Sequence, residues 1–335
     1  MSKAKSVSIQ RDKFWERNRK SGGYLLKKTI NTALYKIVRA ILLFGLCFLI
    51  LQPLLNKISV SFMAEKDLYD STVISVPRNF TTANYKLADQ LMNYWLCLKN
   101  TVLVALLVSI IQVSACTLAG YGFARYKFPL KNFWFAMVML SILVPPQTIS
   151  ASLYLHFRFF DVFGIIKAIT GDTINLQNSM LPYLMMCLGC MGLKSGLYIF
   201  LMRQFFRNIP KELEEAAYVD GCGKFKTFLR IMLPDAKPIL TSCFLFAYVW
   251  QWTDSYYAKL FLGSVQLLPK ALTSITGRLG DYWQVIKGWG QQPSAAFEQA
   301  LIATGLLMTL IPLLIIYLVA QKGFVESLSQ SGIKM

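Results

Sequence analysis

Long apolar runs alternate with short polar segments along most of the 335 residues. Several runs reach about 20 residues, the length that a helix needs to cross about 30 Å of hydrocarbon. A helix satisfies its own backbone hydrogen bonds, which lipid cannot do. We therefore predict an all-α membrane protein with about six transmembrane helices, over residues 37–58, 100–122, 132–156, 179–203, 239–261 and 298–320.

The remaining residues divide the predicted chain into three parts. We expect a basic N-terminal extension over 1–36, a transmembrane domain over 37–322 and a C-terminal tail over 323–335. An inner loop over 204–238 lies between the fourth and fifth predicted helices. The first apolar run follows a long, mostly polar segment and precedes no small-residue cleavage site, so we interpret it as a retained helix rather than a signal peptide.

The charged residues indicate how the chain is oriented. The formal net charge is +18, but the 35 Lys and Arg lie between the apolar runs and at their ends. With a cytoplasmic N-terminus, most of them fall on the inner side, as the positive-inside rule requires. We therefore predict that both termini are cytoplasmic and that the protein binds lipid rather than nucleic acid. A nucleic-acid-binding arm at the basic N-terminus is the alternative interpretation.

The seven cysteines predict no disulfide framework, because most of them fall within apolar runs. The spacing of Cys187 and Cys190 is that of a redox pair, but packing within a spanning helix is the better interpretation. A single histidine without a ligand cluster cannot form a metal site, so we expect no metal.

The inner loop carries the most specific local pattern, over residues 209–234. Pro210 suits the first position of a helix, where its missing N–H removes no helical bond. Three glutamates follow where the helix dipole favours negative charge: Glu212, Glu214 and Glu215. Gly221 can adopt the left-handed conformation that ends a helix, and we expect Pro234 to end the amphipathic stretch after it. The alternative is an amphipathic loop lying in the lipid headgroups.

Within this loop, Glu215-Ala216-Ala217, Asp220-Gly221 and Ile231-x-Leu233-Pro234 resemble the EAA motif of binding-protein-dependent ABC importer permeases. Three further stretches resemble motifs of the carbohydrate-uptake, maltose-permease-like members: 119–129, 200–210 and 321–334. The resemblance covers about residues 35–335. It implies a type I ABC importer permease fold and a permease subunit that translocates a sugar or oligosaccharide.

By this resemblance, the helix from Pro210 to Gly221 is a coupling helix that docks in a cleft of a cytoplasmic ATPase. Residues with this implied coupling role are Glu214, Glu215, Ala216, Ala217, Asp220, Gly221, Gly223, Ile231, Leu233 and Pro234. Glu215 and Asp220 would supply polar contacts, and the two alanines would allow close packing. The chain has no G-x-x-x-x-G-K-[ST] phosphate loop, so we expect no catalytic residue and no bound cofactor, with ATP and Mg²⁺ on the partner ATPase.

The resemblance also implies the partners and the location. The partners are a second, non-identical permease, two cytoplasmic ATP-binding subunits and an extracytoplasmic solute-binding protein, in a bacterial cytoplasmic membrane. An importer of a peptide or amino acid is the alternative substrate class. An ion-coupled carrier fits less well, because the sequence shows few intramembrane acids and no strong internal repeat.

Two stretches supply candidate contacts along the substrate pathway. Lys194 lies deep in a predicted span, where a charge usually faces a cavity. The flanking Gly192 and Gly196 suggest a helix interruption, which is tolerated where the backbone lines a cavity. The alternative is that Lys194 snorkels to the headgroups. The stretch 250–257 combines aromatic rings with an acid and resembles the family's Trp-x-Asp stretch. Such groups suit sugars, although an interfacial aromatic belt is the alternative. The pathway candidates are Lys194, Trp250, Trp252, Asp254 and Tyr256. Candidates for docking of the binding protein are His156, Arg158 and Asp161.

Overall fold

The computed structural model describes the chain except residues 1–17, 71, 74–75 and 333–335. Within the described ranges the regular structure is helical, and only two isolated β-bridges occur. The elements in chain order are α2 (Tyr24–Ser61), α3 (Glu65–Tyr69), α4 (Ala83–Met92), α5 (Tyr94–Arg125), α6 (Lys131–Leu143), η1 (Pro146–Ile149), α7 (Ser150–Arg158), α8 (Ile165–Thr170), α9 (Leu181–Leu188), α10 (Ser195–Asn208), α11 (Glu212–Val219), α12 (Lys224–Thr227), η2 (Phe228–Met232), α13 (Leu233–Asp235), α14 (Lys237–Thr253), α15 (Tyr256–Phe261), α16 (Leu268–Thr273), α17 (Ile275–Lys287) and α18 (Ala295–Gly332).

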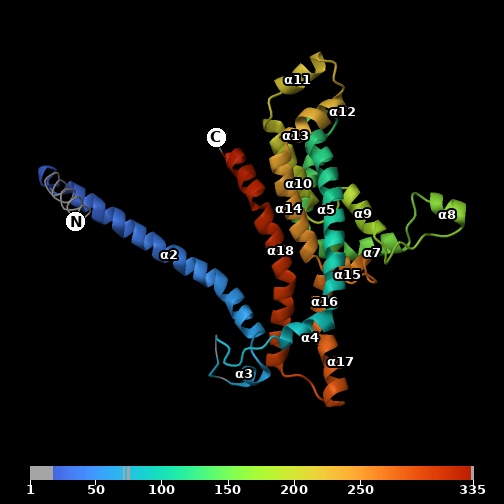
Figure 1. Ribbon diagram of the computed structural model, residues 1–335. Coiled ribbons are helices and arrows are strands. Elements are labelled where there is room, and N and C mark those ends of the chain that lie inside the picture. Colours follow the sequence, from blue (N-terminus) through green and yellow to red (C-terminus); the bar gives the residue numbers. More distant parts are fainter. Residues whose placement is uncertain (1–17, 71, 74–75, 333–335) are drawn as a thin grey trace.

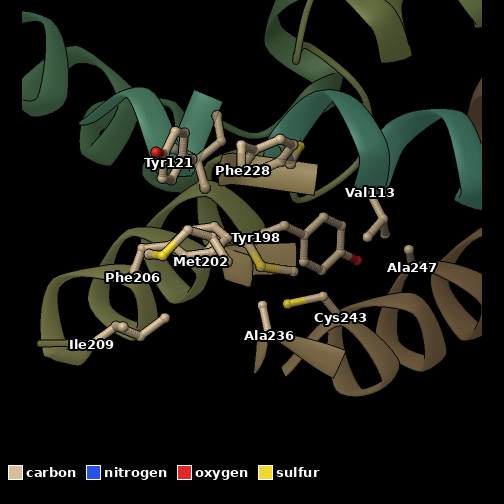
Figure 2. Close-up of a cluster of buried hydrophobic side chains, with 13 residues drawn as sticks. Val113, Tyr121, Tyr198, Met202, Phe206, Ile209, Phe228, Ala236, Cys243 and Ala247 are labelled. Atoms are coloured by element: carbon tan, nitrogen blue, oxygen red, sulfur yellow. The ribbon is translucent and has the colours of Figure 1, made fainter. Parts of the chain in front are cut away.

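Four long helices form the centre of the molecule, because α5 packs on α10 and α14, and α14 packs on α18 (Figure 1). Gly120 of α5 sets the close approach to α10, since a Cβ there would lie 2.6 Å from the Cβ of Met202. The buried side chains beside it include Tyr198, Met202 and Phe206 of α10 and Phe228 of η2 (Figure 2). This core lies next to the end of the bundle that carries α11.

The helices suited to crossing a membrane are fewer than the sequence predicts. Three described helices are long and apolar enough, namely α2, α5 and α18 as far as Gln321. A fourth crossing is possible if α6 and the η1–α7 segment count as one span, although the two parts meet at 101°. The helical fold is as predicted, while the total of six crossings and the cytoplasmic placement of both termini stay predictions.

The helices predicted over 132–156, 179–203 and 239–261 are each broken in the structure, and of these breaks only the one beside Gly192 and Gly196 is predicted from the sequence. The first is broken at Pro145 and Pro146, since proline cannot donate a helical hydrogen bond. The second is interrupted between Leu188 and Ser195, where Cys190 and Lys194 adopt positive φ values. The third is interrupted at Asp254, which is extended. Each break lies beside a glycine, a proline or a polar side chain that hydropathy averaging hides.

The first and last helices extend past their predicted limits. The helix α2 begins at Tyr24 rather than at residue 37, so part of the predicted N-terminal extension is helical. Residues 1–17 of that extension lie outside the described residues. The helix α18 continues to Gly332, so no break separates the predicted tail from the last span. Figure 1 shows α2 leaning away from the bundle, and its most apolar stretch is 0% buried.

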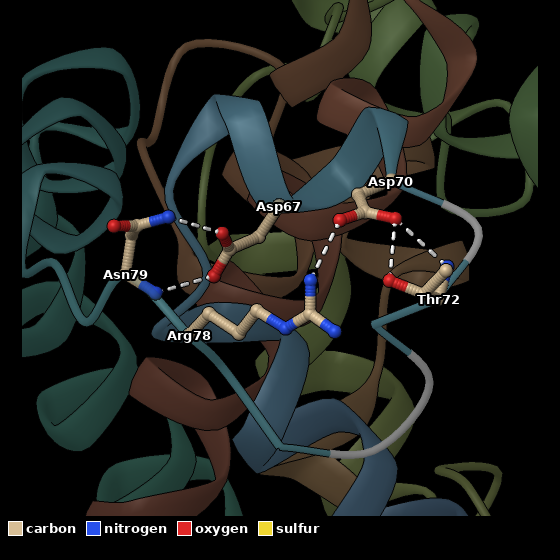
Figure 3. A network of polar contacts seen from close by, with 5 residues as sticks. All are labelled: Asp67, Asp70, Thr72, Arg78 and Asn79. Carbon is tan, nitrogen blue, oxygen red and sulfur yellow. Dashed lines mark hydrogen bonds and ion pairs between the residues drawn. The ribbon is translucent and has the colours of Figure 1, made fainter.

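A hydrogen-bonded loop follows α2 at the end of the bundle opposite α11 (Figures 1 and 3). The Asp67 carboxylate accepts bonds from the backbone N–H of Asn79 (2.7 Å) and from its side-chain amide (2.6 Å). Asp70 forms an ion pair with Arg78 at 3.0 Å and accepts bonds from Thr72. Together these bonds tie the short helix α3 to the chain that enters α4.

We expect acid to open this loop through Asp67. The backbone hydrogen bond from Asn79 holds the pKa of Asp67 below its ordinary value. The ionised Asp67 carboxylate therefore stabilises the folded loop fully above about pH 4, and this stabilisation is lost as the pH falls through the lowered pKa. Hydrogen exchange at the Asn79 amide, corrected for its intrinsic pH dependence, should show protection that falls only in acid.

The matched control is Asp70, whose ion pair with Arg78 is exposed (side chains 40% and 63% accessible). Exposed pairs contribute little to stability. We therefore expect Asp67→Ala to remove the protection of the Asn79 amide at neutral pH and Asp70→Ala to preserve most of it. Equal losses in the two variants would contradict this role for Asp67.

Candidate functional site

The coupling segment predicted from sequence forms a short helix, α11, followed by α12, η2 and α13 at one end of the bundle (Figure 1). Gly221 has a φ of 77°, which confirms the left-handed conformation expected after the helix. Its N–H donates to the carbonyl of Tyr218, and the next N–H donates to that of Ala217. These bonds satisfy carbonyl groups at the end of α11.

Two details of this segment differ from the sequence prediction. Pro210 precedes the helix, which begins at Glu212 with Lys211 at the N-cap. Pro234 does not end the second stretch, because it lies in the first turn of α13, where a missing N–H costs no helical bond. Residues 228–232 before it form a π-helix, so the chain continues through this proline with helical geometry.

We expect Gly221→Ala to destabilise the end of α11 by about 1 kcal/mol, because a side chain at positive φ is strained. Gly223→Ala is the matched control, since Gly223 has a φ of −70°. An added Cβ would meet no atom within 4 Å at either site, so backbone conformation alone separates the variants. Faster protease cleavage within 209–236 is expected for Gly221→Ala only, and equal cleavage rates would contradict the argument.

Glu214 anchors α11 to the end of α5. Tyr121 donates a hydrogen bond of 2.8 Å to Glu214 Oε1, and Arg125 Nε lies 3.3 Å from Oε2. The ion-paired side chains of Arg125 and Glu214 are only 7% and 10% accessible. Arg125 also donates a bond of 2.7 Å to the Ile209 carbonyl oxygen. The sequence placed Glu214 in the coupling group and residues 119–125 in a separate motif, but it did not show that the two are joined.

The other side of α11 is exposed. Its accessible residues include Glu215, Ala216, Val219 (88% accessible) and Asp220. Ala217 is buried against the chain itself, so the expectation that Ala217 packs on a partner is wrong for this structure. Of the remaining coupling candidates, Gly221, Gly223 and Pro234 are exposed, while Ile231 and Leu233 are half-buried. The exposed apolar side chains nearby are Leu213, Phe225 and Leu229.

A buried polar network joins the helix breaks in the middle of the bundle. Gln112 of α5 donates to the Leu193 carbonyl (2.6 Å) and to Ser195 Oγ (2.8 Å), both beside the α9–α10 break. Gln251 of α14 donates to Gln112 Oε1 at 3.0 Å. The Tyr183 hydroxyl of α9 lies 2.6 Å from Gln251 Oε1.

Asp254 completes this network at the α14–α15 break. Its Oδ2 lies 2.5 Å from the Tyr183 hydroxyl, and its Oδ1 accepts backbone N–H bonds from Tyr256 and Tyr257. The sequence identified Asp254, whereas Gln112, Tyr183 and Gln251 were missed. The sequence did carry a signal for two of them, because a glutamine within an apolar run, such as Gln112 or Gln251, needs buried hydrogen-bond partners.

The hydrogen bonds of this network determine where its protons lie. The Leu193 carbonyl can only accept, so Gln112 presents its NH₂ group there and its oxygen to Gln251. Gln251 then presents its own oxygen to Tyr183, and the Tyr183 hydroxyl donates its single proton to this oxygen. The Tyr183 hydroxyl thus has one proton for two acceptors, and we infer that the carboxyl group of Asp254 supplies the proton of their 2.5 Å contact. A neutral Asp254 also avoids burying an unpaired charge.

Two cavities lie beside the α14–α15 break. The first, of about 320 Å³, lies between the bend after α6 and the α9–α10 break, and its lining includes Ser141, Lys194 and Tyr257. The second, of about 650 Å³, lies between α7 and α15, and its lining includes Tyr154, Tyr256 and Lys259. Tyr256 and Tyr257 are consecutive, so the start of α15 contributes to both cavities.

The predicted pathway residues separate into two groups. Lys194 and Tyr256 line the cavities, and Lys194 Nζ lies 5.2 Å from the centroid of the Trp250 ring. Trp252 is fully buried and donates to the Thr309 carbonyl of α18 at 3.2 Å. Neither Trp252 nor Asp254 lines a cavity, which argues against direct sugar contacts by these two residues.

The predicted docking residues lie around the end of α7. His156 and Arg158 are exposed, and Arg158 donates to the Tyr154 hydroxyl at 3.2 Å. Asp161 accepts the backbone N–H of Ile166 at 2.9 Å, so its carboxylate stabilises the start of α8. Across the described ranges, no group of three or more metal-binding side chains occurs.

The comparisons with known proteins agree with this arrangement. The family described as "Binding-protein-dependent transport system inner membrane component" matches residues 116–328. The arabinooligosaccharides transport system permease protein AraQ of Halalkalibacterium halodurans is 24% identical over 294 residues, which are 86% of this chain and 93% of that protein. The sn-glycerol-3-phosphate transport system permease protein UgpE of Escherichia coli is 27% identical over 238 residues, 71% of this chain and 74% of that protein.

A solved structure shows the same fold. The match is a chain of a bacterial ABC transporter involved in the import of the acidic polysaccharide alginate, with a TM-score of 0.63 and 18% sequence identity. The alignment covers 86% of this chain and 96% of that chain. The family match includes α10, α11, α14, the C-terminal end of α5 and most of α18, which carry much of the core and the coupling segment. This chain therefore belongs to the family of inner membrane components of binding-protein-dependent transport systems.

Proposed function

We propose that this chain is one permease subunit of an ABC importer that translocates a sugar or oligosaccharide. The anchored helix α11 carries the proposal. Glu214 fixes one side of α11 to α5, while Glu215, Ala216 and Val219 are exposed on the other side of the helix. A short helix held rigidly at one end of a membrane bundle, with an accessible apolar and acidic surface, suits docking to a cytoplasmic ATPase.

The chemistry would be divided between subunits. Two partner ATPases would bind ATP and Mg²⁺ and hydrolyse the nucleotide, and this chain would bind no cofactor. Closure of the ATPases would move α11 and bias the bundle between inward and outward access, as a ligand biases a two-state equilibrium. A second, non-identical permease would complete the pathway in a bacterial cytoplasmic membrane, and an extracytoplasmic binding protein would deliver the substrate near the exposed His156 and Arg158.

The sugar assignment rests on relatives and on the cavities. The names of two relatives refer to arabinooligosaccharides and to glycerol 3-phosphate, both of which carry several hydroxyl groups. The cavities offer tyrosine rings and hydroxyls, which suit the apolar C–H faces and the hydroxyl groups of a sugar.

The test is ATP hydrolysis by the complete importer, purified with its partner subunits and binding protein and reconstituted in lipid. Neutral oligosaccharides, acidic oligosaccharides, dipeptides and free amino acids would be compared at equal concentration. We expect hydrolysis to rise with at least one class of sugar and with neither dipeptides nor amino acids. Stimulation by dipeptides or amino acids alone would contradict the proposal and support the alternative substrate class.

A further inference from the structure

The two cavities have the same charge pattern. The first includes Lys194 and the second includes Lys259, and no Asp or Glu lines either one. Neither lysine forms an ion pair within the part of the chain that the structure describes, where the ion pairs are Arg78–Asp70 and Arg125–Glu214. Both lysine side chains are exposed, so each cavity is lined by one accessible cation and by no acid.

The acid between the cavities does not neutralise them. Asp254 turns both oxygens inward, one to the backbone N–H groups of Tyr256 and Tyr257 and the other to Tyr183. The proton count of the network also leaves its carboxyl group uncharged. The start of α15 thus contributes to two cavities that are each lined by a lysine, and the carboxyl group of Asp254 is occupied by contacts within the chain.

A cavity lined by charges of one sign raises the local concentration of solutes of the opposite sign. A neutral sugar needs no cation, because aromatic rings and hydroxyl groups suffice to bind it. We propose that the imported sugar carries an acid group, a carboxylate or a phosphate, which Lys194 and Lys259 contact in turn along the pathway. The inference rests on the proposed function, and it adds the chemical class of the substrate.

The ring of Trp250 gives Lys194 a second role in this scheme. The ammonium group lies 5.2 Å from the ring centroid, within the range of a cation–π contact. The contact holds the cation at the edge of the first cavity without neutralising it. Trp250 itself lines neither cavity, so its role here is to position the Lys194 ammonium group.

Matched probes can test the inference on the reconstituted importer. Oligogalacturonate would be compared with a neutral galacto-oligosaccharide of the same length, and glycerol 3-phosphate with glycerol. The first pair tests a carboxylate and the second a phosphate. Hydrogen bonds to charged groups contribute enough to change affinity at least about tenfold, so we expect at least this preference for the acidic member of one pair, in uptake and in direct calorimetric binding.

The variants are Lys194→Gln and Lys259→Gln, with Lys194→Arg as the conservative variant. Lys287→Gln is the matched control, because Lys287 Nζ also lies near a tryptophan ring (Trp283, 5.8 Å) but outside both cavities. We expect each cavity variant to lower binding of the preferred acidic probe at least about tenfold. Lys194→Arg and Lys287→Gln should retain it, and binding of neutral probes should not change in any variant.

The outcomes separate this inference from the proposed function. If neutral sugars drive uptake as well as acidic ones do, or if Lys→Gln affects both equally, the inference is wrong while sugar import stands. If no sugar stimulates ATP hydrolysis or uptake, the proposed function itself is wrong, and the inference fails with it.

Discussion

Glu214→Ala is expected to destabilise the chain by about 3–5 kcal/mol, because it leaves the buried Arg125 guanidinium without its counter-charge. It also removes the acceptor of the Tyr121 hydroxyl. The segment that carries α11 should separate from α5, so ATP hydrolysis driven by substrate should fall with stability. Thermal unfolding of the purified chain in detergent, followed by intrinsic fluorescence, measures the first effect.

Glu215→Ala is the matched control, because its side chain is the exposed neighbour on the same helix. We expect its stability to stay within about 0.5 kcal/mol of wild type, and its substrate-stimulated ATP hydrolysis to fall through loss of a contact with the ATPase. The double variant Arg125→Ala with Glu214→Ala should be less destabilised than the sum of the two single variants. Similar unfolding temperatures for Glu214→Ala and Glu215→Ala would contradict the anchoring role.

Asp254 should tolerate asparagine and not alanine. The side-chain NH₂ of asparagine can replace the carboxyl proton toward Tyr183, and its oxygen can accept the N–H groups of Tyr256 and Tyr257. Alanine leaves these buried groups unsatisfied, at a cost of about 1–3 kcal/mol for each lost partner. We expect Asp254→Asn to remain near wild type in unfolding temperature and uptake, and Asp254→Ala to lose both.

The comparison between the two Asp254 variants also tests the proton count. An asparagine mimics a neutral carboxylic acid in shape and in hydrogen bonding. If Asp254→Asn were as damaging as Asp254→Ala, the negative charge itself would be required and the assignment of a proton to Asp254 would be wrong. Tyr183→Phe provides an independent control, since it removes the hydroxyl that joins Asp254 to Gln251.

Local sequence chemistry predicted the short helix of the coupling segment well. The positive φ of Gly221 and the placement of the glutamates in the first turn of α11 depend on only a few neighbouring residues. Both features can therefore be predicted from the local sequence. The anchoring of Glu214 could not be predicted in this way, because its partners Tyr121 and Arg125 lie about 90 residues earlier. Only the packing of α10 and η2 against α5 brings them together.

The helix breaks show a second limit of prediction from sequence. Average hydropathy predicts one span over 179–203, and only Gly192 and Gly196 within it indicate an interruption. At Gly196 a Cβ would lie 2.7 Å from Ser141 Oγ of α6, so the need for glycine comes from a neighbouring helix. The burial of Trp252 likewise depends on α18, whose Thr309 lies 57 residues further along the chain. Contacts over such distances decide which aromatic residues line a cavity.

The Arg125 guanidinium contacts both the Ile209 carbonyl, before α11 begins, and Glu214 within its first turn. One hydrogen bond and one ion pair from this planar group hold the start of the helix to α5, whereas its far end stops at Gly221. A force applied near Val219 therefore acts as a torque about Arg125. From that pivot, α5 extends 13 residues, about 20 Å at 1.5 Å per residue, to Gln112 and the network that joins the broken helices.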